Sequence, residues 1–90
     1  MASDGARLTL RLYNGDEFLR EQVFSQPTIG IGRLSSSDLR LDAKNASRMH
    51  ARIEVKGPND VSITDLLSAT GTFVNGQKAP GTLRIQSGDS

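Results

Sequence analysis

Hydrophobic and polar residues alternate along short stretches of the chain. From residue 7 to residue 13, Leu8, Leu10 and Leu12 are separated by polar side chains, and this period of two is typical of a strand with one buried face. Similar stretches recur to the end of the chain, and hardly any segment shows a helical period. The pattern predicts strands at residues 7–13, 17–24, 28–32, 38–41, 49–56, 61–64, 72–74 and 82–85.

Turn residues separate these predicted strands. Asn14-Gly15 and Asn75-Gly76 each lie between two strand-like segments, and Asn-Gly is a strong hairpin signal because both residues accept a positive φ. Many short strands at a spacing of roughly 8–12 residues indicate an all-β sandwich or barrel. We therefore expect an antiparallel β-sandwich. The strand predicted at 49–56 carries Met49, Ala51, Ile53 and Val55 on one face.

Composition narrows the class of protein. Ninety residues are enough for one small domain, and the chain has no cysteine and a net charge of only +1, so neither a disulfide framework nor a basic nucleic-acid surface is expected. The one histidine has no metal-ligating partners in the sequence, so no metal or other cofactor is expected. The chain has no apolar run long enough to span a membrane and no secretory signal. We expect a cytoplasmic domain without direct membrane contact.

The chain stops at Gly88-Asp89-Ser90, a turn that normally leads into another strand. We therefore expect residues 1–90 to form a single domain that lacks its last edge strand and belongs to a larger protein.

Three predicted loops, at 32–37, 45–50 and 67–72, are rich in small polar residues. Arg33 and Arg48 supply guanidinium groups that make forked, charge-assisted hydrogen bonds to phosphate. Ser47 adds a hydroxyl donor, and loop N–H groups add fixed donors. If the loops meet at one end of the sandwich, they form a phosphate site, although arginine and serine are also ordinary surface residues.

The order of these motifs resembles the forkhead-associated (FHA) domain. Its pattern is Gly-Arg, Ser-x-x-His, an Asn-Gly-Thr loop and a following Asn-Gly. This chain has Gly32-Arg33, Ser47 to His50, Thr70-Gly71-Thr72 and Asn75-Gly76 in the same order. The resemblance runs from about Thr28 to Asp89. It implies a β-sandwich of about eleven short strands that binds phosphothreonine peptides through loops at one end and catalyses nothing.

The resemblance also implies a role for each matching residue. Arg33 would bind the phosphate, Ser47 would donate a hydrogen bond to it, and Arg48 would contact the phosphate or the peptide backbone. His50 would hold its loop, with Gly32, Gly71, Asn75 and Gly76 permitting the backbone turns. Peptide contact and selectivity are expected from Asn45, Ala69 and Thr70 and their neighbours. The implied partner is a phosphothreonine-containing protein in a Ser/Thr kinase pathway.

Thr70 departs from the family pattern, which has asparagine there. Asparagine offers a carbonyl and an amide to the peptide main chain, whereas Thr70 offers one hydroxyl. Ala69 also lacks the hydroxyl that often precedes that asparagine. The phosphate contacts are thus retained, and the contacts to the peptide backbone are expected to be weaker or rearranged.

Two other functions are compatible with the sequence. A phosphate-independent scaffold of the same fold would bind through a sheet face and would not need Arg33. A nucleophilic enzyme could be assembled from Ser47, His50 and Asp65, but a triad is defined by its geometry. The chain also has no second acid–base group suited to neutral pH.

Overall fold

The computed structural model describes residues 7–42 and 44–90. Nine strands lie in this part of the chain, against the roughly eleven that the family pattern implies. They are β1 (Leu8–Asn14), β2 (Glu17–Phe24), β3 (Thr28–Gly32), β4 (Leu39–Arg40), β5 (Ala51–Gly57), β6 (Asp60–Asp65), β7 (Phe73–Val74), β8 (Gln77–Lys78) and β9 (Thr82–Ile85). The all-β prediction is therefore confirmed. Among the described residues, none forms a long apolar helix that could cross a membrane.

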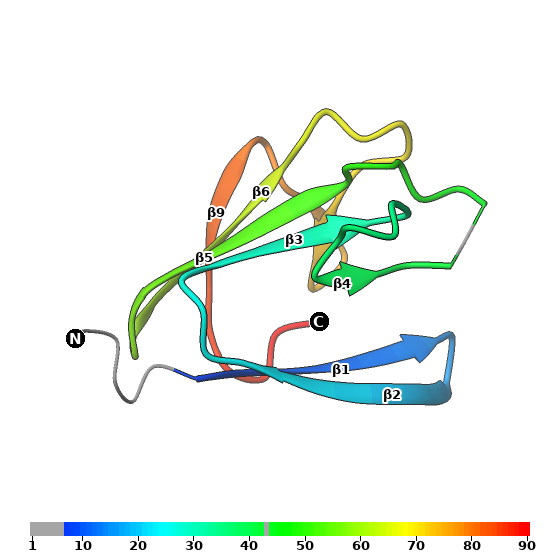
Figure 1. Cartoon of the computed structure of the whole chain (residues 1–90). Coiled ribbons are helices and arrows are strands. Elements are labelled where there is room, and N and C mark those ends of the chain that lie inside the picture. Colours follow the sequence, from blue (N-terminus) through cyan, green and yellow to red (C-terminus); the bar gives the residue numbers. More distant parts are fainter. Residues whose placement is uncertain (1–6, 43) are drawn as a thin grey trace.

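The strands form two layers (Figure 1). One is a five-stranded sheet in the order β4-β3-β5-β6-β9, antiparallel except for the parallel pair β3–β4. The other is the β1–β2 hairpin, which lies across from that sheet. A third, short hairpin joins β7 to β8.

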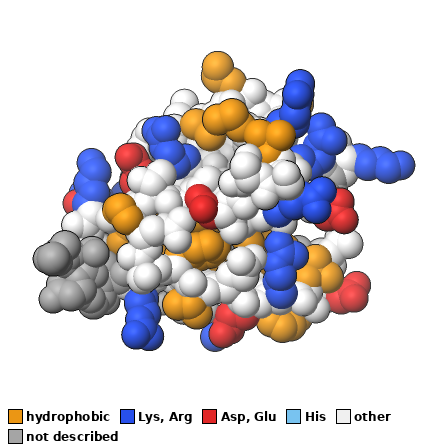
Figure 2. Space-filling model, viewed as in Figure 1, with side chains coloured by type: hydrophobic (Ala, Val, Ile, Leu, Met, Phe, Trp, Pro, Cys, Tyr) orange, Lys and Arg blue, Asp and Glu red, His pale blue; other side chains and the backbone are white. Residues whose placement is uncertain are grey.

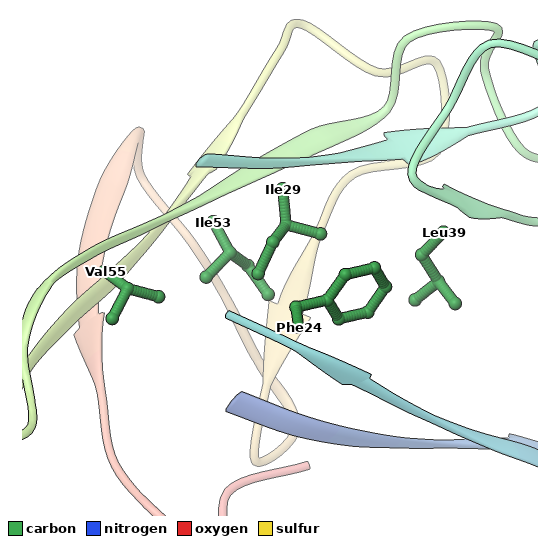
Figure 3. Close-up of a cluster of buried hydrophobic side chains, with 5 residues drawn as sticks. All are labelled: Phe24, Ile29, Leu39, Ile53 and Val55. Carbon is green, nitrogen blue, oxygen red and sulfur yellow. The ribbon is translucent and has the colours of Figure 1, made fainter. Parts of the chain in front are cut away.

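The core lies between the hairpin and the five-stranded sheet, as Figure 3 shows. Phe24 at the end of β2 packs against residues from β3, β4 and β5, and the cluster consists of Phe24, Ile29, Leu39, Ile53 and Val55. Leu8 and Leu10 pack against this cluster from β1, so these two residues of the predicted alternation face the core.

The two predicted hairpin turns form in different ways. Asn75 and Gly76 both have positive φ, 52° and 83°, which is the signature of a type I′ turn. In the first hairpin Asn14 still pairs with Glu17 as the last residue of β1. Only Gly15 of the two loop residues has positive φ, at 63°, which is the pattern of a type II′ turn.

The prediction that Met49 begins the strand and shares a face with Ala51, Ile53 and Val55 is wrong. The strand begins at Ala51, and Met49 is 64% exposed. The Ser47 N–H donates to Nδ1 of His50 at 3.1 Å, and the chain bends at Arg48 and Met49 between these two residues. The alternation of the following strand therefore does not extend back to Met49.

Candidate functional site

Three loops meet at the end of the five-stranded sheet where β3 ends, β5 begins and β6 ends (Figure 1). We call them the first loop (33–38), the second loop (44–50) and the third loop (66–72). Since β3, β5 and β6 are neighbours in the sheet, the loops that extend from them lie side by side. Figure 2 shows Lys and Arg side chains gathered on this side of the molecule.

Gly32 brings the first and second loops into close contact. A Cβ atom at this position would lie 2.1 Å from the carbonyl oxygen of Arg48, far inside any real contact distance. The absence of a side chain lets the Arg33 N–H donate to the Ser47 carbonyl at 3.1 Å and the Leu34 N–H donate to the Arg48 carbonyl at 3.3 Å. Glycine at 32 is therefore required by the approach of the second loop.

The Arg33 side chain lies on the second loop. Its Nε donates to the carbonyl of Ala46 at 2.7 Å, and Ala46 itself is buried. Among the described residues, the two terminal nitrogens of this guanidinium donate no hydrogen bond to the protein, and Arg33 is exposed. A guanidinium held at Nε presents those donors in a fixed plane, which suits an anion with two oxygens.

His50 ties the second loop to the third. Its Nδ1 accepts the Ser47 N–H at 3.1 Å, and its Nε2 lies 2.9 Å from the Gly71 carbonyl. A backbone N–H donates and a carbonyl accepts, so this pattern assigns the neutral tautomer with the proton on Nε2. Gly71 has a φ of 88°, and this conformation turns its carbonyl toward the ring without the strain another residue would incur.

Ser47 has one free hydrogen-bond direction. Its Oγ accepts the N–H of Ala69 at 2.9 Å. A hydroxyl that accepts still has its own hydrogen to donate, and Ser47 is half-buried. The residue therefore joins the second loop to the third and keeps one donor for a ligand.

The Thr70 hydroxyl is used inside the protein. It donates to the Asn45 carbonyl at 3.1 Å, which adds a second bond between the third loop and the second. The hydroxyl hydrogen is thus not available to a peptide carbonyl. Thr70 and Asn45 were both predicted to contact the peptide, and in the structure they contact each other.

Asp65 organises the third loop from inside. Its carboxylate accepts the Ser68 N–H at 3.2 Å, the Ser68 hydroxyl, and the Thr72 hydroxyl at 2.7 Å. The hydroxyl hydrogen bonds from Ser68 and Thr72 lower the pKa of the Asp65 carboxyl below its ordinary value. The Ser68 Oγ in turn accepts the Gly71 N–H at 3.0 Å, so one carboxylate fixes both halves of the loop.

Sequence reasoning did not assign this positioning role to Asp65, Ser68 and Thr72. The available signal is an acidic residue three positions before a serine, a spacing that favours a side-chain-capped turn.

The residues of the imagined triad do not form one. Both ring nitrogens of His50 bond to backbone atoms, those of Ser47 and Gly71, and neither bonds to the Ser47 hydroxyl or to Asp65. The base–nucleophile and base–carboxylate pairs that define a triad are therefore missing from this arrangement.

Most of the predicted site residues lie together on the three loops or directly beside them. The structure brings together the three loops that carry Arg33, Asn45, Ser47, Arg48, Ala69, Thr70 and Gly71, with Gly32 and His50 beneath them. Arg48 is exposed, and its carbonyl accepts the Leu34 N–H. Asn75 and Gly76 form the β7–β8 turn. A hollow of about 360 Å³ lies beside Asn75, Arg84 and Asp89, and none of its lining residues belongs to the three loops.

The sequence profile of the FHA domain matches residues 29–90. The chain belongs to the FHA domain family. FHA domains are binding modules rather than enzymes, which agrees with a site made of donors on rigid loops.

Relatives of this FHA domain include the transcriptional regulatory protein EmbR of Mycobacterium tuberculosis. It is 41% identical over 59 residues, which are 66% of this chain and 15% of EmbR. A solved structure of M. tuberculosis EmbR in complex with a low-affinity phosphopeptide is similar at a TM-score of 0.78 and 28% identity, covering 93% of this chain and 21% of that one. Another solved structure, from a study of phosphothreonine-dependent FHA domain interactions, has a TM-score of 0.78 and 30% identity. The match covers 90% of this chain and 80% of that one.

Proposed function

We propose that this FHA domain binds phosphothreonine-containing protein segments through the three-loop site. The observation that carries the proposal is a set of donors without a protein partner among the described residues. They are the terminal guanidinium nitrogens of Arg33 and the hydroxyl hydrogen of Ser47, on two loops hydrogen-bonded to each other. The EmbR structure with a phosphopeptide supports the same ligand class. Since protein Ser/Thr kinases make phosphothreonine, the partner belongs to a kinase pathway.

Affinity in this site comes mainly from the phosphate. Arg33 donates with a full charge, and a hydrogen bond to a charged group contributes about 1.5–3 kcal/mol. Thr70 contributes less to the peptide backbone than an asparagine would, because its hydroxyl is bonded to the Asn45 carbonyl. The affinity of this domain therefore depends more strongly on the phosphate than the affinity of a domain that also has an asparagine bound to the peptide main chain.

The test is titration calorimetry with matched phosphothreonine, phosphoserine and unphosphorylated peptides. Binding should require the phosphate, weaken as ionic strength rises, and fall about 10- to 150-fold in Arg33→Ala, the loss of one charge-assisted contact. Arg84→Ala is the matched control, because it removes the same charge from β9, outside the three loops. Equal affinity for phosphorylated and unphosphorylated peptides would refute the proposal.

A phosphate-independent scaffold is the second candidate, and one observation favours it. Tyr13 and Phe18 at the tip of the β1–β2 hairpin are 53% and 51% exposed and stack edge-to-face, with ring centroids 5.5 Å apart. Exposed aromatic residues are common in protein interfaces. This candidate predicts partner binding that survives Arg33→Ala and is lost in Phe18→Ser, the reverse of the phosphopeptide result.

A further inference from the structure

The outer face of the β1–β2 hairpin carries an apolar patch. This face points away from the five-stranded sheet (Figure 1). Four large apolar side chains of the hairpin are each about half exposed: Tyr13 53%, Phe18 51%, Leu19 47% and Val23 55%. We call these four residues the hairpin patch. They lie on β1 and β2 rather than on the three loops, so the proposed phosphate site does not account for their exposure.

Strand pairing places the four residues on one face. Arg11 and Glu21 are paired across the hairpin and hydrogen-bonded at 2.9 Å. Alternate residues of a strand share a face, so Tyr13 lies on the face of Arg11, and the two patch residues before and after Glu21 lie there as well. Phe18 joins them, because its ring stacks edge-to-face on Tyr13 with centroids 5.5 Å apart. Leu10 packs against the core, so this shared face is the outer one.

The hairpin patch has the size of a weak interaction surface. A large apolar side chain has a surface of about 150–250 Å², so four half-exposed side chains present roughly 300–400 Å². Apolar patches of this size on a monomer are often binding sites. A stable interface buries about 800 Å² on each partner. The patch therefore suits a weak association rather than a permanent one.

We propose that the hairpin patch is the interface of a weak dimer between two copies of this domain. This inference goes beyond the proposed function. The charges on the face select the occupant, because Arg11 and Glu21 lie side by side as a neutral pair among the apolar residues. A two-fold interface uses the same surface of both copies and must be complementary to itself. A cation beside an anion meets that condition, since each copy supplies the opposite charge to the other.

The charge pair also sets the direction of the two-fold axis. An axis that runs along the strands, between β1 and β2, places Arg11 of each copy against Glu21 of the other. The same axis places Tyr13 against Phe18 of the second copy, because these two residues are also paired across the hairpin. An axis across the strands would place Arg11 against Arg11 and Glu21 against Glu21, and like charges in contact oppose association. The axis along the strands is therefore favoured.

This axis leaves both hairpin tips at the same end of the dimer. In Figure 1 the hairpin tip lies at the end of the domain that carries the three loops. The two three-loop sites of the dimer therefore face the same way. Under the proposed function, a partner with two phosphothreonines would hold two copies together at a high effective concentration, and the weak contact at the hairpin would then be populated.

The experiment is sedimentation equilibrium of the purified domain at concentrations from about 10 µM to 1 mM, the range in which an interface of this size should dissociate. Phe18→Ser should weaken the association at least about 10-fold. Met49→Ser is the matched control, because it removes a side chain that is 64% exposed on the second loop, and it should leave the association unchanged. A wild-type domain that stays monomeric, or a dimer that survives Phe18→Ser, would overturn the proposal, even if the hairpin binds a different protein.

Charge exchange tests the two-fold arrangement. Arg11→Glu should weaken the association at least about 5-fold, and the double variant Arg11→Glu/Glu21→Arg should restore it. A fluorescently labelled double variant should not associate with the wild-type domain, because like charges then face each other across the axis. Equal association of the double variant with itself and with wild type would refute this arrangement.

Titration calorimetry with phosphothreonine peptides separates this proposal from the proposed function. Phe18→Ser and Arg11→Glu should bind a peptide with one phosphothreonine as wild type does, because neither substitution touches the three loops. A monomeric domain that binds such peptides through Arg33 would refute the dimer and leave the proposed function standing. A dimer that binds no phosphopeptide would refute the proposed function alone.

Discussion

The close approach of two backbones at Gly32 makes a sharp prediction about alanine at this position. Gly32 has no positive φ, so on backbone conformation alone Gly32→Ala should stabilise the domain by about 0.4–1 kcal/mol through the unfolded chain. The added Cβ, however, would lie 2.1 Å from the Arg48 oxygen, 2.8 Å from the Arg48 carbonyl carbon and 3.2 Å from the His50 nitrogen. These two effects have opposite signs, so the sign of the measured change decides which one dominates.

The magnitude follows from what must move. Real Cβ contacts do not fall under 3.0 Å, so the Arg48 carbonyl must retreat from 2.1 Å by 0.9 Å or more. That displacement acts on three backbone bonds, from Arg33 to Ser47 at 3.1 Å, from Leu34 to Arg48 at 3.3 Å and from His50 to Ile31 at 2.9 Å. Each such bond contributes about 0.5–1.5 kcal/mol net. Loss of two or three of them removes about 1–4.5 kcal/mol, against an unfolded-state gain of about 0.4–1 kcal/mol. We therefore expect a net loss of about 2 kcal/mol, and of at most about 4 kcal/mol.

Urea unfolding followed by circular dichroism measures this change, because the chain has no tryptophan to report it by fluorescence. Gly81→Ala is the matched control: its added Cβ would meet nothing within 4 Å, and its φ is not positive. The control should be neutral or more stable by up to about 1 kcal/mol. If the urea midpoint of Gly32→Ala equals or exceeds that of wild type at an unchanged m-value, the first and second loops separate at little cost. The prediction that the close approach at Gly32 holds them rigidly would then be wrong.

Three further predictions concern stability. Because hydrogen bonds lower the pKa of Asp65 below its ordinary value of 3.8, the stability this carboxylate provides is present above about pH 4 and is lost as the pH falls through the lowered value. In Asp65→Asn the free energy of unfolding should therefore depend less on pH below about pH 4. An unchanged pH dependence in that range would contradict the lowered pKa of Asp65. Ile29→Ala should cost about 2–5 kcal/mol in urea unfolding, because Ile29 is fully buried; a cost below 1 kcal/mol would mean that the core collapses around the cavity. Arg11→Ala should cost less than about 1 kcal/mol, since its 2.9 Å ion pair with Glu21 is largely exposed, and a larger loss would contradict that view.

The strands could be predicted from the sequence because each has a local cause. Alternation of apolar and polar residues marks β1 and β5, and Asn75-Gly76 adopts the positive φ values that its residue types favour. The same reasoning predicts Met49 as part of the strand, but the chain bends between Ser47 and His50, whose backbone N–H and ring are hydrogen-bonded, before the strand begins. Local patterning does not reveal where such a side-chain bond interrupts it.

The candidate site was only partly accessible from the sequence, for a different physical reason. Arg33 and Ser47 could be singled out because their chemistry suits phosphate. The inward bond of Thr70 to the Asn45 carbonyl, by contrast, joins residues 25 positions apart. The left-handed conformation of Leu67 likewise runs against the preference of its own residue type. Both features follow from how the loops meet, which no single segment determines.

The contacts beneath the site explain how a small domain could bind with few outward groups. The third loop is held from inside by the Asp65 carboxylate on Ser68 and Thr72. Further hydrogen bonds join it to the second loop, among them those from His50 to Gly71 and between Ser47 and Ala69. The second loop is held by the first through the backbone of Arg33. A ligand that meets donors already fixed in place loses little binding free energy to ordering them. We therefore expect the residues beneath the site to contribute to the affinity of the proposed phosphate contacts. Gly32→Ala tests that dependence most directly, because it leaves the Arg33 and Ser47 donors chemically intact.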